Sequence, residues 1–310
     1  MEYKLTTIRE IIGDVLCEQG RKNPDIYVID SDLAKSTTTN KFQNEFPNRF
    51  VETGIAEQNA VSIATGIADE GKIPFYVNFA IFVSGTAWTQ VRQACYANAN
   101  VKFIATHPGM DGGYDGASHH ANEDIALMRT IPGMTVIVPS DDIEAKAAVK
   151  AAAAMEGPVY MRFGRLAVPV INDEDYKFEI GKGKVLREGT DVAIIANGLC
   201  VAESLDAAEK LAAEGINAQV INMATVKPLD TELVLEAAKA TGKVVTVEEH
   251  SVIGGLGSAV CDVLSEQLPT PVLKIGVNDV FGHSGPAVEL IKEFGLDGDS
   301  IAAKVKEFVK

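Results

Sequence analysis

The stretch VETGIAEQNAVSIATGIADEG, residues 51–71, combines the spacing of a packed helix with a single carboxylate at its start. Its apolar residues recur at helical intervals from Ala56, and Gly71 stands where the C-terminal cap of a helix belongs. Its many small residues predict close packing against neighbouring elements. Glu57 lies in the first turn, where the helix dipole favours its negative charge but burial disfavours it. The pattern leaves two interpretations, an exposed helix-start residue or a carboxylate with a chemical role.

On both sides of this helix, short apolar runs alternate with amphipathic segments. The segment 5–20 is predicted to be an amphipathic helix, and so is the segment 299–310. Such alternation predicts an α/β fold in which mostly parallel sheets are covered on both faces by helices. The predicted strands are 25–30, 72–78, 101–106, 134–140, 158–163, 191–197, 217–223, 243–250 and 271–277.

The alternation breaks once, over the polar segment 166–189. Its composition, with NDEDYKFE and GKGK, is that of a linker. We therefore expect two domains, residues 1–165 and 190–310, each with a mostly parallel sheet flanked by helices. In such open sheets ligands bind at the carboxyl ends of the strands, so the loops that follow the strands are the places to search for chemistry.

The overall composition limits the possible partners. The chain of 310 residues has a net charge of −15, which disfavours nucleic acid because its phosphates would be repelled. No apolar run is long enough to span a bilayer, and the start MEYKLTTIRE lacks the pattern of a signal segment. A cytoplasmic protein without membrane contact is expected. The cysteines lack metal-ligand spacing and are expected to be buried free thiols: Cys17, Cys95, Cys200 and Cys261.

The loop HPGMDGGYDGASHH, residues 107–120, follows a predicted strand and is rich in glycine. It holds three of the five histidines of the chain and two aspartates: His107, His119, His120, Asp111 and Asp115. Histidines at the carboxyl end of a strand favour proton handling or hydrogen bonding to a hydroxylated substrate. A zinc site is disfavoured because the two adjacent histidines cannot easily both point at one ion. The plainer alternative is a flexible surface loop with incidental histidines.

Two other strand ends carry candidate residues. Phe79 and Phe82 stand three apart, so they share a face of a helical turn and either fill the core or stack on a ligand. Their position, just after the strand that follows the Glu57 helix, favours the ligand. Asp30 and Asp32 could bind magnesium, although aspartates in such loops more often cap the next helix.

Several nucleotide and nucleophile motifs are absent. SVIGGLGSAV, residues 251–260, does not match GxGxxG because Val260 takes the third glycine position. Neither a P-loop nor a GxSxG elbow occurs. GLDGDS, residues 295–300, is not a magnesium-diphosphate motif, which needs an asparagine well downstream of its GDG. His250 and His283 are expected to be structural or at an interface.

Taken together, the chain resembles the transketolase family, specifically the C-terminal half of these thiamine-diphosphate enzymes. The resemblance covers essentially the whole chain and implies a pyrimidine-binding domain followed by a transketolase C-terminal domain. Its most specific part is the glutamate combined with the DGxSH pattern. The motifs that carry it are DLAKS (32–36), GIAEQNAVSIATGIA (54–68), FAIFVSG (79–85), HPGMDGGYDGASHH (107–120), PSDDIEA (139–145), MRFGR (161–165), ATVKPLD (224–230) and VEEHSVIGGLGSAV (247–260).

The resemblance implies that thiamine diphosphate is the cofactor and that Glu57 is catalytic. In this family the matching glutamate hydrogen-bonds N1′ of the aminopyrimidine and promotes loss of the proton from thiazolium C2. A carboxylate in an apolar site has the raised proton affinity that this role needs. Phe79 and Phe82 match the aromatic residues that lie against the pyrimidine ring.

The resemblance also implies a site for a phosphorylated sugar. The positions that match its phosphate-binding residues are Arg9, Ser36, His107 and Arg165. Asp115 and His119 match positions that contact the hydroxyls and the C1–C2 region of the donor sugar, and both His107 and His119 are expected to be catalytic. The chain departs from the common family pattern at Ala56, at residues 85–86 and at His120.

The implied activity is transfer of a two-carbon ketol unit between phosphorylated sugars, as in the pentose phosphate pathway. The diphosphate-binding half, with GDG and its asparagine, is not in this sequence, so Mg²⁺ and the diphosphate are expected to be held by a separate N-terminal subunit. No metal ligand is assigned to this chain, and a self-dimer within an α₂β₂ assembly is expected. Three alternatives stay open: the beta subunit of a 2-oxoacid dehydrogenase, half of a 1-deoxyxylulose-5-phosphate synthase, and a scaffold without catalysis.

Overall fold

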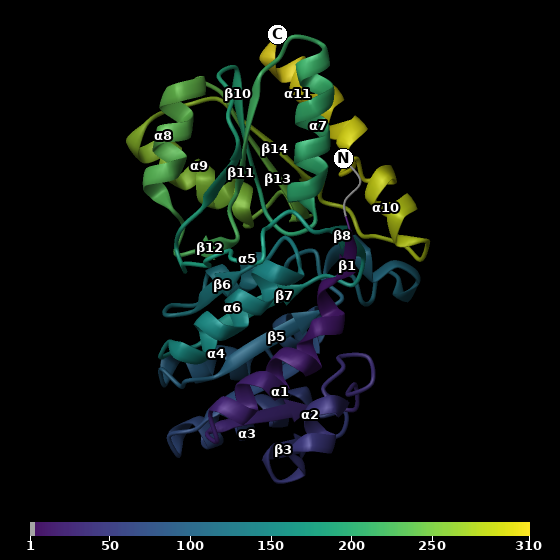
Figure 1. Ribbon diagram of the computed structural model, residues 1–310, viewed down its shortest axis with the longest axis vertical. Coiled ribbons are helices and arrows are strands. Elements are labelled where there is room, and N and C mark those ends of the chain that lie inside the picture. Colours follow the sequence, from purple (N-terminus) through teal and green to yellow (C-terminus); the bar gives the residue numbers. More distant parts are fainter. Residues whose placement is uncertain (1–3) are drawn as a thin grey trace.

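The computed structural model describes residues 4–310, which form two α/β units stacked along the long axis of the molecule (Figure 1). The unit drawn in purple to teal contains a seven-stranded sheet in the order β12 (Thr225–Lys227), β6 (Thr135–Ile137), β7 (Val159–Phe163), β5 (Lys102–Thr106), β4 (Ile73–Phe79), β2 (Ile26–Asp30) and β3 (Phe50–Glu52). The green and yellow unit contains a five-stranded sheet in the order β14 (Val272–Val277), β13 (Val244–Ser251), β10 (Val192–Ala196), β11 (Ala218–Asn222) and β9 (Lys184–Arg187). This confirms the predicted two-domain α/β fold.

The central strands of both sheets pair in parallel and are buried on both faces, which explains their unbroken apolar runs. In the larger sheet Phe103 of β5 stands opposite Tyr160 of β7, and both side chains are fully buried. Antiparallel pairing occurs where β12 joins β6 and where β9 joins β11. The elements that connect or cover the larger sheet are η1 (Ile8–Ile11), α1 (Ile12–Lys22), α2 (Asn40–Glu45), η2 (Pro47–Arg49), α3 (Glu57–Asp69), η3 (Phe82–Thr86), α4 (Trp88–Tyr96), η4 (Gly109–Asp115), α5 (Asp124–Arg129) and α6 (Asp142–Ala154).

The smaller sheet is flanked by helices on its two faces, with α7 and α11 packed together on one of them. Asp297 begins α11 by accepting a hydrogen bond from the backbone N–H of Ser300, so the helix starts slightly before the predicted segment 299–310. The helices of this unit are α7 (Cys200–Ala213), α8 (Thr231–Thr241), α9 (Leu256–Gln267), α10 (Ala287–Glu293) and α11 (Gly298–Val309).

The helix predicted after residue 56 forms as α3, whose buried face is made of small and β-branched side chains. Ala60, Val61 and Ala64 are fully buried, so the helix lies close to its neighbours. The helix ends at Asp69, and Gly71 follows with a φ of 77°, which is the left-handed conformation expected of a terminating glycine.

The helix predicted over residues 5–20 begins later than expected. Residues Leu5–Thr7 form strand β1, which pairs antiparallel with β8, Ala167–Pro169, and a helical turn starts only at Ile8. The β-branched threonines suit a strand, and Thr6 Oγ1 donates a hydrogen bond to Asp142 at 2.9 Å. Both β8 and β9 fall within the segment 166–189 that was predicted to be a linker, so that segment adds an edge strand to the smaller sheet.

Strand β12 connects the two units. It comes from the C-terminal half of the chain but extends the N-terminal sheet beyond β6. Lys227 of β12 donates from Nζ to the carbonyl oxygens of Arg129 and Ile131, at 2.9 and 2.6 Å. The two units are therefore joined by backbone pairing as well as by side chains.

Two further expectations concern the thiols and the membrane. All four cysteines are free, as predicted, but Cys261 is half-buried, unlike the buried Cys17, Cys95 and Cys200. It lies on α9, where the flanking Asp262 is exposed to solvent.

Among residues 4–310, no helix has the length and apolar character that crossing a membrane requires.

Two alanine substitutions test how tightly the N-terminal unit is packed. A Cβ at Gly13 of α1 would overlap the backbone oxygen of Thr38, whereas a Cβ at Gly66 of α3 would meet no atom within 4 Å. Overpacking typically costs about 1–3 kcal/mol, while replacing a helical glycine by alanine stabilises a helix by up to about 1 kcal/mol. We expect Gly13→Ala to unfold at a lower urea concentration than the wild type, and Gly66→Ala at an equal or higher concentration. Urea unfolding of the isolated chain, followed by circular dichroism, measures both midpoints. Equal midpoints for the two variants would contradict this packing.

Candidate active site

Four aromatic rings come together where β4 and β5 end. The imidazole of His107 lies 4.0 Å from the ring of Phe79, measured between centroids, and Phe79 stacks on Phe82 at 6.0 Å with an angle of 12°. The imidazole of His119 meets Phe82 edge-on at 5.4 Å. These four rings are called the ring cluster below. The structure thus joins two segments that the sequence had marked separately, the stretch with Phe79 and Phe82 and the loop 107–120.

Local backbone geometry explains how Phe79 and Phe82 reach one wall. β4 ends at Phe79, and residues Phe82–Thr86 form a single π-helical turn before α4 begins. Single π-helical turns of this kind are frequent at functional sites. Phe79 is 9% exposed and Phe82 is half-exposed, so the stacked pair presents an apolar surface rather than only filling the core.

His107 holds the deepest position in the ring cluster. Its φ is 53°, a left-handed conformation that is costly for a residue other than glycine and is often found at functional sites. Its Nδ1 lies 2.9 Å from Thr106 Oγ1, which leaves Nε2 for another partner. Burial, followed by the positive charges of Arg9 and Arg165, lowers the pKa of His107 to about 3. The imidazole is therefore neutral at physiological pH.

Two arginines border His107 and bring further predicted residues to the site. Arg9 Nη1 donates to the carbonyl oxygen of Ser36 at 3.0 Å, and Arg9 Nε is buried without a hydrogen-bond partner among residues 4–310. Arg165 Nη1 donates to the carbonyl oxygen of Gly112 at 2.9 Å and pairs with Asp115 at 3.1 Å. The two guanidinium groups form a cationic rim that matches the charge of a phosphate or sulfonate.

Glu57 lies at the start of α3, beside the turn that carries Phe82. Gln58 Nε2 donates to the carbonyl oxygen of Thr86 at 3.2 Å, which ties the helix start to that turn. Glu57 is half-buried, and among the described residues its carboxylate forms neither a helix cap nor another hydrogen bond. Burial, together with the smaller effect of the negative charge of Glu57, raises the pKa of Tyr76. Hydrogen bonds with Ser31 and Asn78 act in the opposite direction. A half-buried acid with free acceptor oxygens is suited to a ligand.

Asp30, at the end of β2, organises the loop of residues 31–39. Asp30 is buried and accepts hydrogen bonds from the N–H of Leu33 and from the hydroxyls of Thr37 and Thr39, at 2.7, 2.8 and 2.9 Å. Burial raises the pKa of Asp30. Within residues 4–310 no group of three or more histidine, cysteine, aspartate or glutamate side chains has the geometry of a metal site. The interpretation of Asp30 as a structural acceptor fits, and a magnesium role for Asp30 and Asp32 gains no support.

The remaining histidines lie outside the ring cluster. His120 Nε2 is 3.0 Å from the carbonyl oxygen of Gly113, so this nitrogen is engaged within the loop. His250 is buried and its Nε2 accepts the N–H of Ala126 at 3.2 Å, which is a structural role. His283 is exposed and pairs with Glu293 at 2.9 Å.

Sequence reasoning missed a buried ion cluster behind the loop 107–120. It consists of charged side chains that are at most 4% exposed: Asp111, Asp124, Arg162 and Glu249. Asp111 was noted only as an acid of the loop, and the other three lie in or next to segments that otherwise look like core. The available signal was a charged residue inside the apolar runs PVYMRF and KVVTVEEH, which is unusual for strands buried on both faces.

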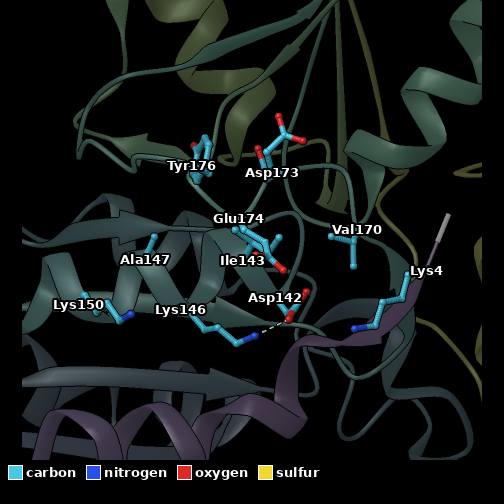
Figure 2. Close-up of a pocket in the computed structure, with 11 residues that line it drawn as sticks. Lys4, Asp142, Ile143, Lys146, Ala147, Lys150, Val170, Asp173, Glu174 and Tyr176 are labelled. Atoms are coloured by element: carbon cyan, nitrogen blue, oxygen red, sulfur yellow. Dashed lines mark hydrogen bonds and ion pairs between the residues drawn. The ribbon is translucent and has the colours of Figure 1, made fainter.

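A surface groove lies elsewhere, away from the ring cluster. Figure 2 shows this groove of about 600 Å³ along α6, with Lys146 paired to Asp142 on its floor. It contains none of the ring cluster, and its positive and negative side chains balance. Its charged lining residues are Lys4, Lys146, Lys150, Asp142, Asp173 and Glu174.

Comparison with known proteins agrees with this arrangement. Residues 4–170 match the family model of the transketolase pyrimidine-binding domain, and residues 181–301 match that of the transketolase C-terminal domain. The chain belongs to the transketolase family. The resemblance inferred from the motifs is thereby confirmed, and apart from β12 each of the two large sheets is formed by one matched region.

Individual relatives span the same length. The chain is 48% identical over 307 residues to a protein of Methanocaldococcus jannaschii named as a transketolase C-terminal section, covering 98% of this chain and 96% of that protein. It is 42% identical to a 6-deoxy-6-sulfo-D-fructose transketolase subunit of a Clostridium species, covering 97% and 94%. A solved structure described as a split gene transketolase, inactive beta4 tetramer, superposes with a TM-score of 0.89 at 50% identity, covering 97% of each chain.

The buried His107 and the exposed His283 are predicted to titrate in opposite directions from the ordinary value. His107 has a pKa lowered to about 3 by burial, whereas hydrogen bonding to Glu293 raises the pKa of the exposed His283 above 6.5. We expect the ring nitrogens of His107 to show neutral ¹⁵N shifts down to about pH 4 and those of His283 to titrate above the reference value. Because His107 gains a proton only on unfolding, the folded chain should lose stability as pH falls from 6.5 towards 3. A His107 signal that titrates near pH 6.5 would contradict its burial among cations.

Proposed function

We propose that this chain is the C-terminal subunit of a split transketolase, which transfers a two-carbon ketol unit between phosphorylated sugars. The observation that carries the proposal is the ring cluster bordered by the cationic rim of Arg9 and Arg165. A flat apolar wall suits a heterocycle, and two guanidinium groups beside a neutral imidazole suit a phosphorylated polyol. A scaffold without catalysis would not need a buried histidine with a strained backbone in this place.

The residues present fit the pyrimidine half of thiamine diphosphate. Phe79 and Phe82 offer a stacked aromatic wall at 6.0 Å, and the half-buried Glu57 has free acceptor oxygens at the start of α3. When bound, this cofactor supplies the nucleophilic carbon and the electron sink for breaking a carbon–carbon bond next to a carbonyl. Glu57 would share a proton with a ring nitrogen, because a carboxyl group in an apolar site holds a proton more tightly. The phenylalanines would orient the ring and exclude water from it.

The other predicted residues would bind the sugar. Arg9 and Arg165 would hold the phosphate by charge-assisted hydrogen bonds, with the loop at Ser36 closing one side. His107 would hydrogen-bond through its Nε2, because its Nδ1 is engaged by Thr106. Asp115 and His119 lie further along the loop and would contact the hydroxyls near the reacting carbons. His107 and His119 would move protons at the sugar oxygens during the reaction.

We propose that Mg²⁺ and the diphosphate are held by a partner N-terminal subunit that carries GDG and the downstream asparagine. The relative described as an inactive beta4 tetramer supports this division. The proposed assembly is α₂β₂, with a self-dimer of this chain, in the cytoplasm, where the four free thiols would stay reduced.

The names of the relatives raise the question of whether the acidic group of the sugar is a phosphate or a sulfonate. One of them is named for a 6-sulfo sugar, and a sulfonate would also suit two guanidinium groups. We commit to phosphate. The reconstituted pair, with thiamine diphosphate and Mg²⁺, should form sedoheptulose 7-phosphate from xylulose 5-phosphate and ribose 5-phosphate. Turnover of only the 6-sulfo sugar, or only decarboxylation of a 2-oxoacid, would replace this substrate assignment.

Glu57 provides the test of the catalytic proposal. Glu57→Gln removes the proton-holding carboxyl but keeps size and polarity, so we expect turnover of the reconstituted enzyme to fall by at least about 100-fold. Glu70→Gln, an exposed change at the other end of α3, is the matched control and should keep wild-type turnover. Unaltered turnover of Glu57→Gln, in a complex that assembles normally, would assign activation to another acid.

The cationic rim predicts selectivity between acceptors. Arg165→Met keeps the apolar part of the side chain but removes the charge, so we expect KM for ribose 5-phosphate to rise by about 10- to 100-fold, as loss of a charged hydrogen bond costs about 1.5–3 kcal/mol. KM for unphosphorylated glycolaldehyde should change little. Equal losses on both acceptors would show that Arg165 acts on the site as a whole and not on the phosphate.

A further inference from the structure

The buried ion cluster joins the two domains directly behind the ring cluster. Arg162 of β7 donates from Nε to both oxygens of Asp124, at 3.1 and 2.9 Å. Its Nη1 lies 3.4 Å from Glu249 Oε2, and its Nη2 donates to the carbonyl oxygen of Glu249 at 2.8 Å. Glu249 belongs to β13 of the smaller sheet, so a guanidinium of the N-terminal domain fixes a carboxylate of the C-terminal domain.

The second oxygen of Glu249 reaches the loop that carries the substrate residues. Glu249 Oε1 accepts the backbone N–H of Asp111 at 2.6 Å. Gly109 has a φ of 54°, and a Cβ there would lie 2.6 Å from the carboxyl carbon of Glu249. The backbone of residues 109–111 therefore rests on this carboxylate. Glycine at 109 is required by both the conformation and the contact.

Asp111 passes this constraint on to Arg165. Asp111 Oδ2 accepts the backbone N–H of Arg165 at 2.6 Å and that of Leu166 at 3.3 Å. The side chain of Arg165 then returns to the loop, where it donates to the carbonyl oxygen of Gly112 at 2.9 Å. A closed circuit of hydrogen bonds thus runs from Glu249 through Asp111 to Arg165 and back to the loop.

The cluster is too enclosed to be a substrate site of its own. The cavity that it lines measures about 10 Å³, which is close to the space of one water molecule. Three carboxylates and one guanidinium are buried together there, and burial raises the pKa of Asp111 to about 6. Burial and the charge of Asp111 also raise the pKa of Glu249. Apolar side chains would fill such a junction at lower cost, so these acids are best explained by the directional contacts they make.

We propose that Glu249 is a positioning residue of the C-terminal domain that sets the place of the phosphate-binding Arg165 through Asp111. This inference rests on the proposed function, because it assigns Arg165 to the phosphate of the sugar. It gives the C-terminal domain a part in substrate recognition, in addition to any role in assembly. The loop also packs against segment 284–287 of the C-terminal domain. Gly113 lies against Gly285 and Ala287, and Gly116 lies against Ser284.

Two substitutions of similar size test the proposal. Glu249→Gln keeps an oxygen that can accept the N–H of Asp111, whereas Glu249→Met fills the space without an acceptor. Glu266→Met, an exposed change on α9 of the same domain, is the control. In the reconstituted enzyme we expect Glu249→Met to raise KM for ribose 5-phosphate at least about 10-fold with a smaller effect on KM for glycolaldehyde. Glu249→Gln should recover most of the wild-type selectivity.

A measurement without activity separates this inference from the proposed function. Hydrogen exchange in the isolated chain should be faster at residues 109–116 in Glu249→Met than in the wild type, with β10 and β4 still protected. Should Glu249→Met fail to fold, Asp111→Ala breaks the same circuit from the other side and should show the same selective effect. Unchanged exchange at 109–116, or equal effects of the Gln and Met variants on KM, would overturn the positioning role. An inactive wild-type complex would instead refute the proposed function and leave the exchange result valid.

Discussion

The contact of the Arg162 guanidinium with Asp124 and Glu249 is the constraint on which the rest of the site depends. It lies where the carboxyl end of the larger sheet meets the smaller sheet, and its side chains are at most 4% exposed. Removing one partner of such a buried pair typically costs about 3–5 kcal/mol, because the other charge is left uncompensated. The loop 107–120 is built on this contact, and the ring cluster is built on that loop.

The site divides its chemistry between depth and rim. At depth, burial and neighbouring cations keep His107 neutral, so its imidazole acts by hydrogen bonding and proton exchange and not by charge. At the rim, the partly exposed Arg9 and Arg165 pair with Glu10 and Asp115, at 2.6 and 3.1 Å. The carboxylate of Glu57 stands half-buried at the start of α3. The apolar wall of Phe79 and Phe82 connects the two zones. This change from solvent-exposed charges to buried rings suits a large ligand that binds with its charged end toward the solvent.

The parts of this structure that could be predicted from sequence are those set by local periodicity. The helix after Ala56 and the buried strands followed from spacing alone. The pairing of β1 with β8 and of β12 with β6 was missed, because each joins segments more than 80 residues apart in sequence. Arg162 and Glu249 were passed over for the same reason, since Arg162 is a single charge in the apolar run PVYMRF and Glu249 lies at the acidic end of KVVTVEEH, and only the fold brings them together. The ring cluster was expected through family resemblance, and its distances required the structure.

The central claim is that Glu57 and the ring cluster hold a thiamine pyrimidine while Arg9 and Arg165 hold a sugar phosphate. The most direct measurement is a structure of this chain assembled with its diphosphate-binding partner, thiamine diphosphate, Mg²⁺ and a phosphorylated ketose. The account predicts the pyrimidine ring against Phe79 and Phe82, its ring nitrogen within hydrogen-bond distance of the Glu57 carboxylate, and the phosphate between the two guanidinium groups. A cofactor bound away from Glu57, or a phosphate seated elsewhere on the chain, would contradict it.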